Sequence, residues 1–525
     1  MVFNSYKFVL AFMPIFMIGM NIVRGYGRKR GNAKLFCELW IILMSLAFFA
    51  SFGVKNMAIL FISVVWNVCT AIPMSFMRDQ GAKVKLFGKE LEPHKAWLCL
   101  GVFGNLVLLL FFKLSGIYLP LAISFYTFNQ ISYIVDLCRG EVKRFDAPEY
   151  LSYALFFPKL LQGPLMNYGS FTGELEKVAG GRLGDSGEAG NGQSSGIDWE
   201  KIMRGLLLFS MGLFKKVILA DTFGKAVDFG FGGVATLGSL EAVLTAVFYS
   251  FQLYFDFSGY CDMASALCMM IGFDLVVNFD SPYQAVNIID FWKRWHITLT
   301  KFFTKYVYIP LGGNRKGVAR TYVNLMIIFL ISGFWHGTGW TFIVWGAMHG
   351  ALYVITRMME RRSGAGVGKT GSQRNDPVRY NSVAAESGVI GSIVKACKVT
   401  LTFLYVTAAW VFFRAETVGQ ALTLFARMFV GGAKPLATGF SSCFQLDELW
   451  YVLKVTPLMK LSFAWDLCLW IFLIFGAGII FFSQNAIRRV KECKIGVGST
   501  LITAILLIWS IISFGGVSTF LYMNF

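Results

Sequence analysis

The sequence has few charged residues, and this scarcity excludes most classes of soluble protein. Only 15% of its 525 residues are Asp, Glu, Lys or Arg, against roughly 25% in an ordinary soluble domain. Hydrophobic residues make up 56%, including 52 Phe, 14 Trp and 20 Tyr. The apolar runs are continuous, whereas the strands of an outer-membrane barrel alternate apolar and polar residues. The composition therefore predicts an all-α polytopic membrane protein.

Patterns that bind metals are also scarce. The chain has four His, and its ten Cys are scattered, with no CxxC pair or other metal-ligand spacing. Most of these Cys lie in apolar runs, where a thiol packs as a small hydrophobic group. We therefore expect neither a metal site nor a bound cofactor.

The formal net charge of +18 comes largely from short basic loops between apolar runs. In a soluble protein this charge would suggest that the protein binds nucleic acid. Here it matches the positive-inside rule, by which Lys and Arg gather in cytoplasmic loops. Basic loops follow the first, third and fifth runs, which places the N-terminus outside. The expected partner is membrane lipid, not nucleic acid.

About a dozen runs are apolar and long enough to cross a hydrocarbon core of roughly 30 Å. They are Tyr6–Val23, Leu35–Phe52, Met57–Phe76, Ala96–Phe112, Leu119–Leu137, Ile202–Leu219, Leu240–Phe257, Tyr322–Trp335, Thr341–Ile355, Ile393–Phe413, Ala464–Phe482 and Ser499–Phe514. Two more apolar stretches, Leu151–Pro164 and Phe291–Leu311, are interrupted by Pro and Gly. Such segments are tolerated at membrane depth only when buried in protein or lining a wet cavity, so we expect re-entrant or interfacial helices there.

The sequence predicts that the whole chain, residues 1–525, forms a single membrane domain with two flexible cytoplasmic loops. Residues 174–200 and 363–392 are rich in Gly, Ser and Asn and have few large apolar side chains. A segment of that composition cannot bury a core.

Polar residues inside apolar runs are candidates for function, because a charge in the bilayer costs about 2.5–3.5 kcal/mol on insertion scales. The densest group lies between Gln252 and His349 and includes His296, His336 and His349. His336 ends an apolar run and is flanked by glycines. A neutral imidazole there could take a proton from a hydroxyl and give it to a leaving group. It could equally be a core residue that bonds a helix carbonyl.

The same alternatives hold for the other polar residues. His296 could be an interfacial residue whose neighbouring Trp belongs to an aromatic belt, and for His349 a structural role is favoured. Asp256 could orient a histidine, although an ion pair with Lys215, Lys216 or Arg294 is favoured. Four basic residues could bind the phosphates of an anionic cosubstrate, and a positive-inside anchor explains them equally well: Lys293, Arg294, Lys301 and Lys305.

Several motifs together resemble one enzyme family. The segments Phe291–Thr300 (FWKRWHITLT), Tyr308–Arg315 (YIPLGGNR), Trp335–Gly337 (WHG) and Trp345–Gly350 (WGAMHG) are similar to the membrane-bound O-acyltransferase (MBOAT) family. Within that family they resemble the membrane subunit of the alginate O-acetyltransferase type. Further matches cover nearly the whole chain: Phe3–Tyr6, Leu119–Phe128, Phe156–Lys159, Gly212–Lys216, Asp256–Tyr260, Asn278–Tyr283 and Ser518–Tyr522.

The resemblance implies a fold in which a ring of tilted helices surrounds a thin central zone crossed by a tunnel. It implies that His336 is the catalytic residue near the centre of the tunnel. His296 is then a second important polar residue on the cytoplasmic approach. The expected supporting residues are His349, Asp256, Asn278, Trp335 and Trp295.

The resemblance also implies an activity and a location. The expected protein is an O-acyltransferase of the bacterial cytoplasmic (inner) membrane that takes acetyl from cytoplasmic acetyl-CoA, a cosubstrate. The acceptor is a hydroxyl of an extracytoplasmic polysaccharide, or a periplasmic or extracellular partner protein that acetylates it. We expect direct transfer with His336 as general base, and a relay through an acyl-enzyme stays open.

Two other functions remain as alternatives. A D-alanyl transferase of the teichoic-acid type shares the RWH and WHG motifs but uses a carrier-protein thioester. A non-catalytic transporter of acyl groups or lipid would use the same polar centre as a pathway. The chain also departs from the family pattern at Ala122, where Gly is usual, at Lys159, where Gln or Thr is common, and at Asn167, where Arg is usual.

Overall fold

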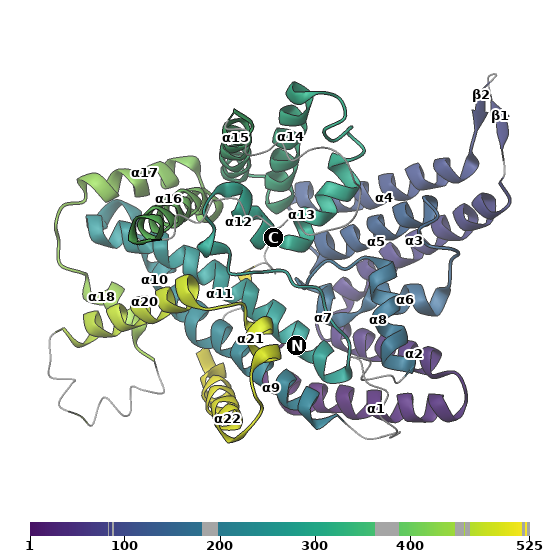
Figure 1. The fold of residues 1–525 in the computed structure, drawn as a ribbon, viewed down its shortest axis with the longest axis horizontal. Helices are drawn as coiled ribbons and strands as arrows, with labels where there is room; N and C mark the ends of the chain where they lie inside the picture. The colour runs from purple at the N-terminus through teal and green to yellow at the C-terminus, as the bar shows by residue number, and fades with distance from the viewer. Residues whose placement is uncertain are drawn as a thin grey trace. The chain divides into compact units, whose positions relative to one another are not determined.

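A computed structural model describes residues 1–81, 83–86, 89–180, 198–362, 388–446, 456, 463–516 and 520–521 (Figure 1). In these ranges the chain is helical apart from one antiparallel hairpin, formed by β1 (Val84–Leu86) and β2 (Lys89–Leu91). The chain divides into two compact units. Unit 1 comprises Met1–Asp221, Leu253–Val277 and Ala486–Phe525, and unit 2 comprises Thr222–Gln252 and Asn278–Asn485. The predicted all-α class is confirmed.

Nine helices in the described ranges are long and apolar enough to cross a membrane, which makes this a multi-pass membrane protein. They are η1 with α1 (Phe8–Lys29), α2 (Ala33–Ala50), α3 (Val54–Asp79), α4 (Pro93–Ser115), α14 (Val318–His336), α15 (Trp340–Arg362), α16 (Val389–Arg414), α20 (Ala464–Phe482) and α22 with η8 (Val497–Gly515).

The other three predicted spans are also helices but do not meet these criteria. α5 (Ile123–Cys138) and α9 (Trp199–Phe214) have 16 residues each, fewer than the roughly 20 needed to cross a bilayer. α11 (Ser239–Ile271) is longer, at 33 residues, but it carries Asp256 and Asp262. By length and composition, nine of the twelve predicted spans thus qualify as candidate membrane spans within the described ranges.

Unit 1 is assembled around an aromatic cluster at the N-terminus. The ring of Phe3 stacks on Tyr260, with centroids 4.8 Å apart, and packs against Phe8, Phe48 and Phe157. The interrupted stretch Leu151–Pro164, predicted to be buried in protein, is buried along almost its whole length. The remaining elements of this unit are α6 (Ala147–Leu155), α7 (Phe157–Leu160), α8 (Tyr168–Gly180), η2 (Lys215–Ala220) and α21 (Ala486–Glu492).

Ala122 occupies a backbone conformation that glycine adopts more easily. It precedes α5 with φ 61° and ψ 16°, in the left-handed region. An L-residue pays roughly 1–2 kcal/mol there because its Cβ crowds the following carbonyl. This conformation gives a physical reason for the glycine that the family pattern has at this position.

Unit 2 contains most of the polar motifs singled out in the sequence. Besides α14, α15, α16 and α20 it holds α12 (Ile288–Arg294), α13 (Ile297–Phe303), η3 (Val234–Thr236), η4 (Pro282–Gln284), η5 (Thr304–Tyr308), α17 (Val418–Val430), α18 (Thr438–Ser441) and η6 (Ser442–Phe444). It also holds α10 (Asp221–Gly232) from its second residue onward.

Glycines let α14 and α15 cross at very short range, side by side in Figure 1. A Cβ added at Gly346 would lie 2.5 Å from the carbonyl oxygen of Phe329, and one at Gly333 would lie 3.5 Å from the Cα of Gly346. One turn further, a Cβ at Gly350 would meet the Met326 sulfur at 2.9 Å. Gly346 and Gly350 are four residues apart, the spacing that lets helix backbones approach closely in membranes.

The two predicted loops, 174–200 and 363–392, are partly helical, which corrects their boundaries. α8 extends to Gly180 because Leu175 and Val178 in its last turns are fully buried. α9 begins at Trp199 and α16 at Val389. Residues 181–197 and 363–387 lie outside the described residues.

Replacing Gly346 with Leu should destabilise the protein, because the new side chain would collide with the backbone of α14. Overpacking of this kind costs typically 1–3 kcal/mol, so the unfolding temperature in detergent should fall. Gly478 in α20 is a matched control, since a Cβ there meets nothing within 4 Å. An unfolding temperature for G346L equal to that of G478L would contradict the packing described here.

Candidate active site

His336 ends α14 and is enclosed by aromatic rings. Only 4% of its surface is exposed. Its imidazole lies 5.2 Å from the ring of Trp345, nearly perpendicular to it, and 5.0 Å from the ring of Phe413. A Cβ at the next residue, Gly337, would overlap the ring of Phe342. The glycines around His336 thus make room for packing between helices.

Asn278 holds His296 in place. His296 is 1% exposed and sits at the start of α13 in the left-handed region, with φ 43°, a conformation that ordinarily needs support from neighbours. Its Nδ1 lies 3.2 Å from Oδ1 of Asn278, which also accepts from the Thr298 hydroxyl at 2.8 Å. The amide of Ile297 donates to the Asn278 carbonyl at 3.0 Å. A proton on Nδ1 in this contact leaves the lone pair of the neutral ring on Nε2.

Tryptophans connect the three histidines of unit 2. The ring of Trp335 lies 6.5 Å from that of His296 and 4.5 Å from that of His336. Trp345 contacts both His336 and His349, the latter at 5.0 Å. Trp295, 1% exposed, stacks on Phe291 and packs against Trp410 in the surrounding core. The structure therefore gathers the predicted residues His296, His336, His349, Asn278, Trp295 and Trp335.

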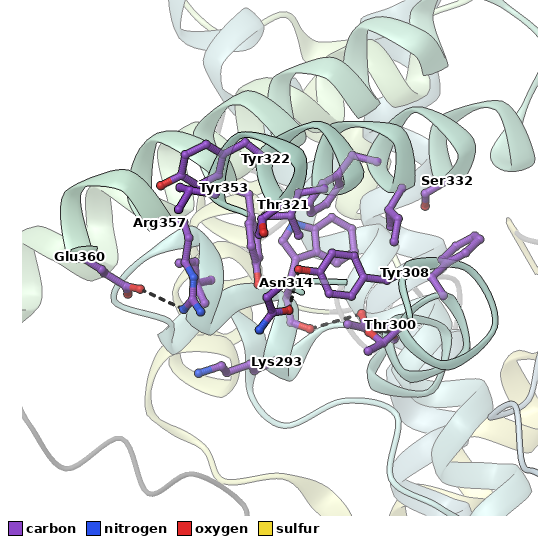
Figure 2. A pocket seen from close by; sticks show the side chains of 18 of the residues that line it. Lys293, Thr300, Tyr308, Asn314, Thr321, Tyr322, Ser332, Tyr353, Arg357 and Glu360 are labelled. Atoms are coloured by element: carbon purple, nitrogen blue, oxygen red, sulfur yellow. Dashed lines mark hydrogen bonds and ion pairs between the residues drawn. The ribbon is translucent and has the colours of Figure 1, made fainter. Parts of the chain in front are cut away.

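A cavity of about 700 Å³ lies along one face of α14 (Figure 2). α14 lines it with residues spaced three or four apart: Val318, Thr321, Tyr322, Leu325, Ile328, Phe329 and Ser332. Val318 and Ser332 are 14 residues apart, or about 21 Å of helix. The next residue on this face, four after Ser332, is His336. The cavity thus ends one helical turn before the imidazole.

Basic side chains gather at the opposite end of this cavity. Lys293, Arg357 and Arg361 line it there, and Figure 2 shows Lys293 and Arg357 far from Ser332. Arg357 lies 3.6 Å from Glu360. Lys293 lies at the end of α12, and Arg357 and Arg361 lie in the last turns of α15. The cavity therefore has a basic mouth and a largely apolar wall formed by residues such as Leu299 and Phe303.

Only one of the four predicted phosphate-binding residues lines the cavity. Lys293 does so, but Arg294 donates to the Asp290 carboxylate at 2.8 Å and to the Asp280 carbonyl at 3.3 Å. Lys301 is exposed on another face of α13, and Lys305 lies over the Tyr306 ring. Arg357 and Arg361 were not among the predicted residues because they follow the end of the apolar run Thr341–Ile355, whereas α15 continues to Arg362. The signal available in the sequence was that these two arginines are four residues apart on the helix that follows the WHG motif.

Asp256 belongs to an ion-pair cluster in unit 1, whereas the histidines lie in unit 2. It accepts from Lys216 at 2.8 Å, and Lys216 also bonds Asp221. The backbone amide of Leu521 donates to its second oxygen. Asp262, six residues on, pairs separately with Lys215 at 2.6 Å. Both aspartates thus form structural ion pairs within unit 1, the alternative favoured for Asp256 from the sequence.

The residues gathered in unit 2 suit proton transfer within a mostly apolar enclosure. Two imidazoles, on His296 and His336, lie near the ring of Trp335. Among the described residues, no group of three His, Cys, Asp or Glu side chains is placed to hold a metal ion. The arrangement offers a base next to a cavity that is long enough for an extended ligand.

Replacing Lys215 with Met should destabilise unit 1, because the Asp262 carboxylate would be left buried without its cation. Breaking a buried pair in this way costs about 3–5 kcal/mol. The double change K215M with D262L removes both charges and should recover most of that loss, measured as the unfolding temperature in detergent. A double variant as unstable as K215M would contradict a simple ion pair.

Comparisons with known proteins agree on one family. The model of the membrane-bound O-acyltransferase family matches residues 138–364, which include His296 and His336. The peptidoglycan O-acetyltransferase of Helicobacter pylori is 34% identical over 471 residues, covering 82% of this chain and 80% of that protein. "Probable alginate O-acetylase AlgI" of Pseudomonas putida is 32% identical over 455 residues, covering 82% and 81%. The teichoic acid D-alanyltransferase of Streptococcus thermophilus is 28% identical over 251 residues, covering 45% of this chain and 56% of that protein.

Proposed function

Because this chain belongs to the membrane-bound O-acyltransferase family, we propose that it transfers acetyl from acetyl-CoA to a hydroxyl of a polysaccharide outside the bacterial inner membrane. Family membership makes it a membrane O-acyltransferase. The observation that carries the finer proposal is the cavity that follows α14 from a basic mouth to the turn before His336. Relatives named for peptidoglycan and alginate acetylation support a glycan acceptor, reached directly or through an extracytoplasmic partner protein.

The donor lies along the cavity, with its phosphates at the mouth and its thioester at the deep end. Arg357, Arg361 and Lys293 supply positive charge where a nucleotide would remain outside. The apolar wall accommodates the extended pantetheine arm. About 21 Å of α14 separates the mouth from Ser332, so the thioester carbonyl is held beside the last turn of α14.

His336 acts as the general base. Its neutral imidazole takes the proton of the acceptor hydroxyl while the oxygen attacks the thioester carbonyl. The carbon–sulfur bond breaks as the tetrahedral intermediate collapses, and the thiolate leaves with the proton returned by the imidazolium. Holding both substrates in a narrow passage lowers the entropic part of the barrier.

His296 is the second polar residue of this site, and Asn278 positions it. The contact with Asn278 fixes the ring so that Nε2 faces away from the loop that carries Asn278. The strained backbone of His296 is consistent with a position maintained for function. We assign to it the binding of a polar group of donor or acceptor on the approach to His336.

A D-alanyl transferase is the second candidate. The relative of that name matches a shorter part of the chain, 45%, at lower identity. Such an enzyme would take its acyl group from a carrier protein and not from free acetyl-CoA. The donor preference of the purified protein separates the two.

Replacing His336 with Gln should abolish acetyl transfer without unfolding the protein. Loss of the base should lower kcat by about 10²–10⁴-fold, measured as release of CoA and transfer of label from acetyl-CoA to a glycan acceptor. H94A is the control, because His94 lies in the first turn of α4, beside Glu92, and belongs to unit 1. Turnover by H336Q at the rate of H94A would refute the assignment. Label that moves only from a carrier-protein thioester would favour the D-alanyl alternative.

Reversing charges at the cavity mouth should weaken donor binding. The double variant R357E with R361E should raise the KM for acetyl-CoA about tenfold or more, because charge-assisted bonds to phosphate are lost, while kcat stays unchanged. K301E is the matched control, since Lys301 is equally basic but does not line the cavity. With acetyl-pantetheine, which lacks the nucleotide, wild type and variant should have the same KM. A tenfold increase for K301E as well would show that net charge alone is responsible.

A further inference from the structure

His349 is a fully buried imidazole that no protein group satisfies. It lies in α15 between Gly346 and Gly350 and is 0% exposed. Within the described part of the chain, neither of its ring nitrogens has a hydrogen-bond partner. Its ring is enclosed by six aromatic side chains: Phe291, Trp292, Phe329, Trp345, Tyr405 and Trp410.

Three of those six side chains also carry a buried polar atom that no described protein group satisfies. The indole N–H groups of Trp292, Trp345 and Trp410 are buried and, among the described residues, have no acceptor. The centroids of these rings lie 5.1, 5.0 and 5.8 Å from that of His349. Together with the imidazole they offer four N–H donors and one acceptor lone pair.

Buried polar atoms of this kind are normally satisfied, very often by ordered water. Water both donates and accepts, so it matches a set of indole donors around an imidazole. A phenylalanine at position 349 would fill the same aromatic enclosure without polar atoms. An ionisable residue kept at such a position inside a membrane span points to a role in function.

The location of His349 connects the cavity to the catalytic histidine. Trp292, 5.1 Å from His349, lines the cavity. Trp345, on the other side, packs edge-on against His336. His349 therefore touches both a wall of the donor cavity and a ring that borders the proposed base.

We propose that His349 and the indoles of Trp292, Trp345 and Trp410 bind internal water, and that His349 is thereby a positioning residue for acyl transfer. This inference rests on the proposed function. His349 touches no substrate. Hydrogen bonds through the water hold Trp345 against His336, so that the imidazole meets the thioester in a single orientation.

The test compares two substitutions of His349. H349F keeps the ring but removes the polar atoms, and it should lower kcat about tenfold or more through misorientation of His336, with the KM for acetyl-CoA unchanged. H349Q can donate and accept, and it should restore most of kcat. Y405F is the control, because the Tyr405 hydroxyl donates to the Met348 carbonyl next to His349; it should change the unfolding temperature but not kcat.

Retention of wild-type kcat by H349F, or equal inactivity of H349F and H349Q, would overturn the proposal. A second measurement does not depend on turnover. A high-resolution cryo-EM map of the whole protein in a lipid nanodisc should show water within hydrogen-bond distance of His349 and of at least one of the three indoles. A map that shows no water within hydrogen-bond distance of the His349 ring would also overturn the proposal. Absence of acetyl-CoA turnover in the wild type would instead refute the proposed function, and the map would still test the water site.

Discussion

The close approach of α14 and α15 at Gly333 and Gly346 is the contact on which the candidate active site depends. A side chain at either position would strike the backbone of the other helix. This crossing places His336, at the end of α14, against Trp345 of α15. It also directs the face of α14 that ends at His336 toward the cavity. Association of helices in lipid relies on such packing, because the bilayer supplies no hydrophobic drive between them.

The two units accommodate their buried polar groups in different ways. Unit 1 pairs several of its buried charges, as Lys216 does with Asp256 and Asp221 and Lys215 does with Asp262. Unit 2 surrounds neutral imidazoles with aromatic rings. Paired charges neutralise one another and stabilise a fixed arrangement, whereas a neutral imidazole in an apolar enclosure keeps its ability to exchange a proton. This contrast explains why we assign a structural role to the paired residues of unit 1 and a role in proton transfer to the histidines of unit 2.

Much of the site was predictable because its residues stand beside one another in short motifs. RWH and WHG pointed to His296 and His336. The broken stretch Phe291–Leu311 was expected to be buried in protein or to line a cavity, and several of its residues between Trp292 and Tyr308 do line one. The sequence did not predict that Arg357 and Arg361 lie at the cavity mouth, because the apolar part of α15 ends before the helix does. Arg294 does not line the cavity and pairs with Asp290, one turn earlier on the same short helix.

The sequence alone determined the membrane environment, the helical class and the family, because apolar runs and local motifs depend only on neighbours along the chain. Only the tertiary structure decided which glycines pack helices, that Asn278 supports His296 across 18 residues, and that Asp256 pairs with lysine. It also placed the cavity along a single face of α14. These features depend on contacts between segments distant in sequence, and the distance and direction of such contacts are set only when the helices pack.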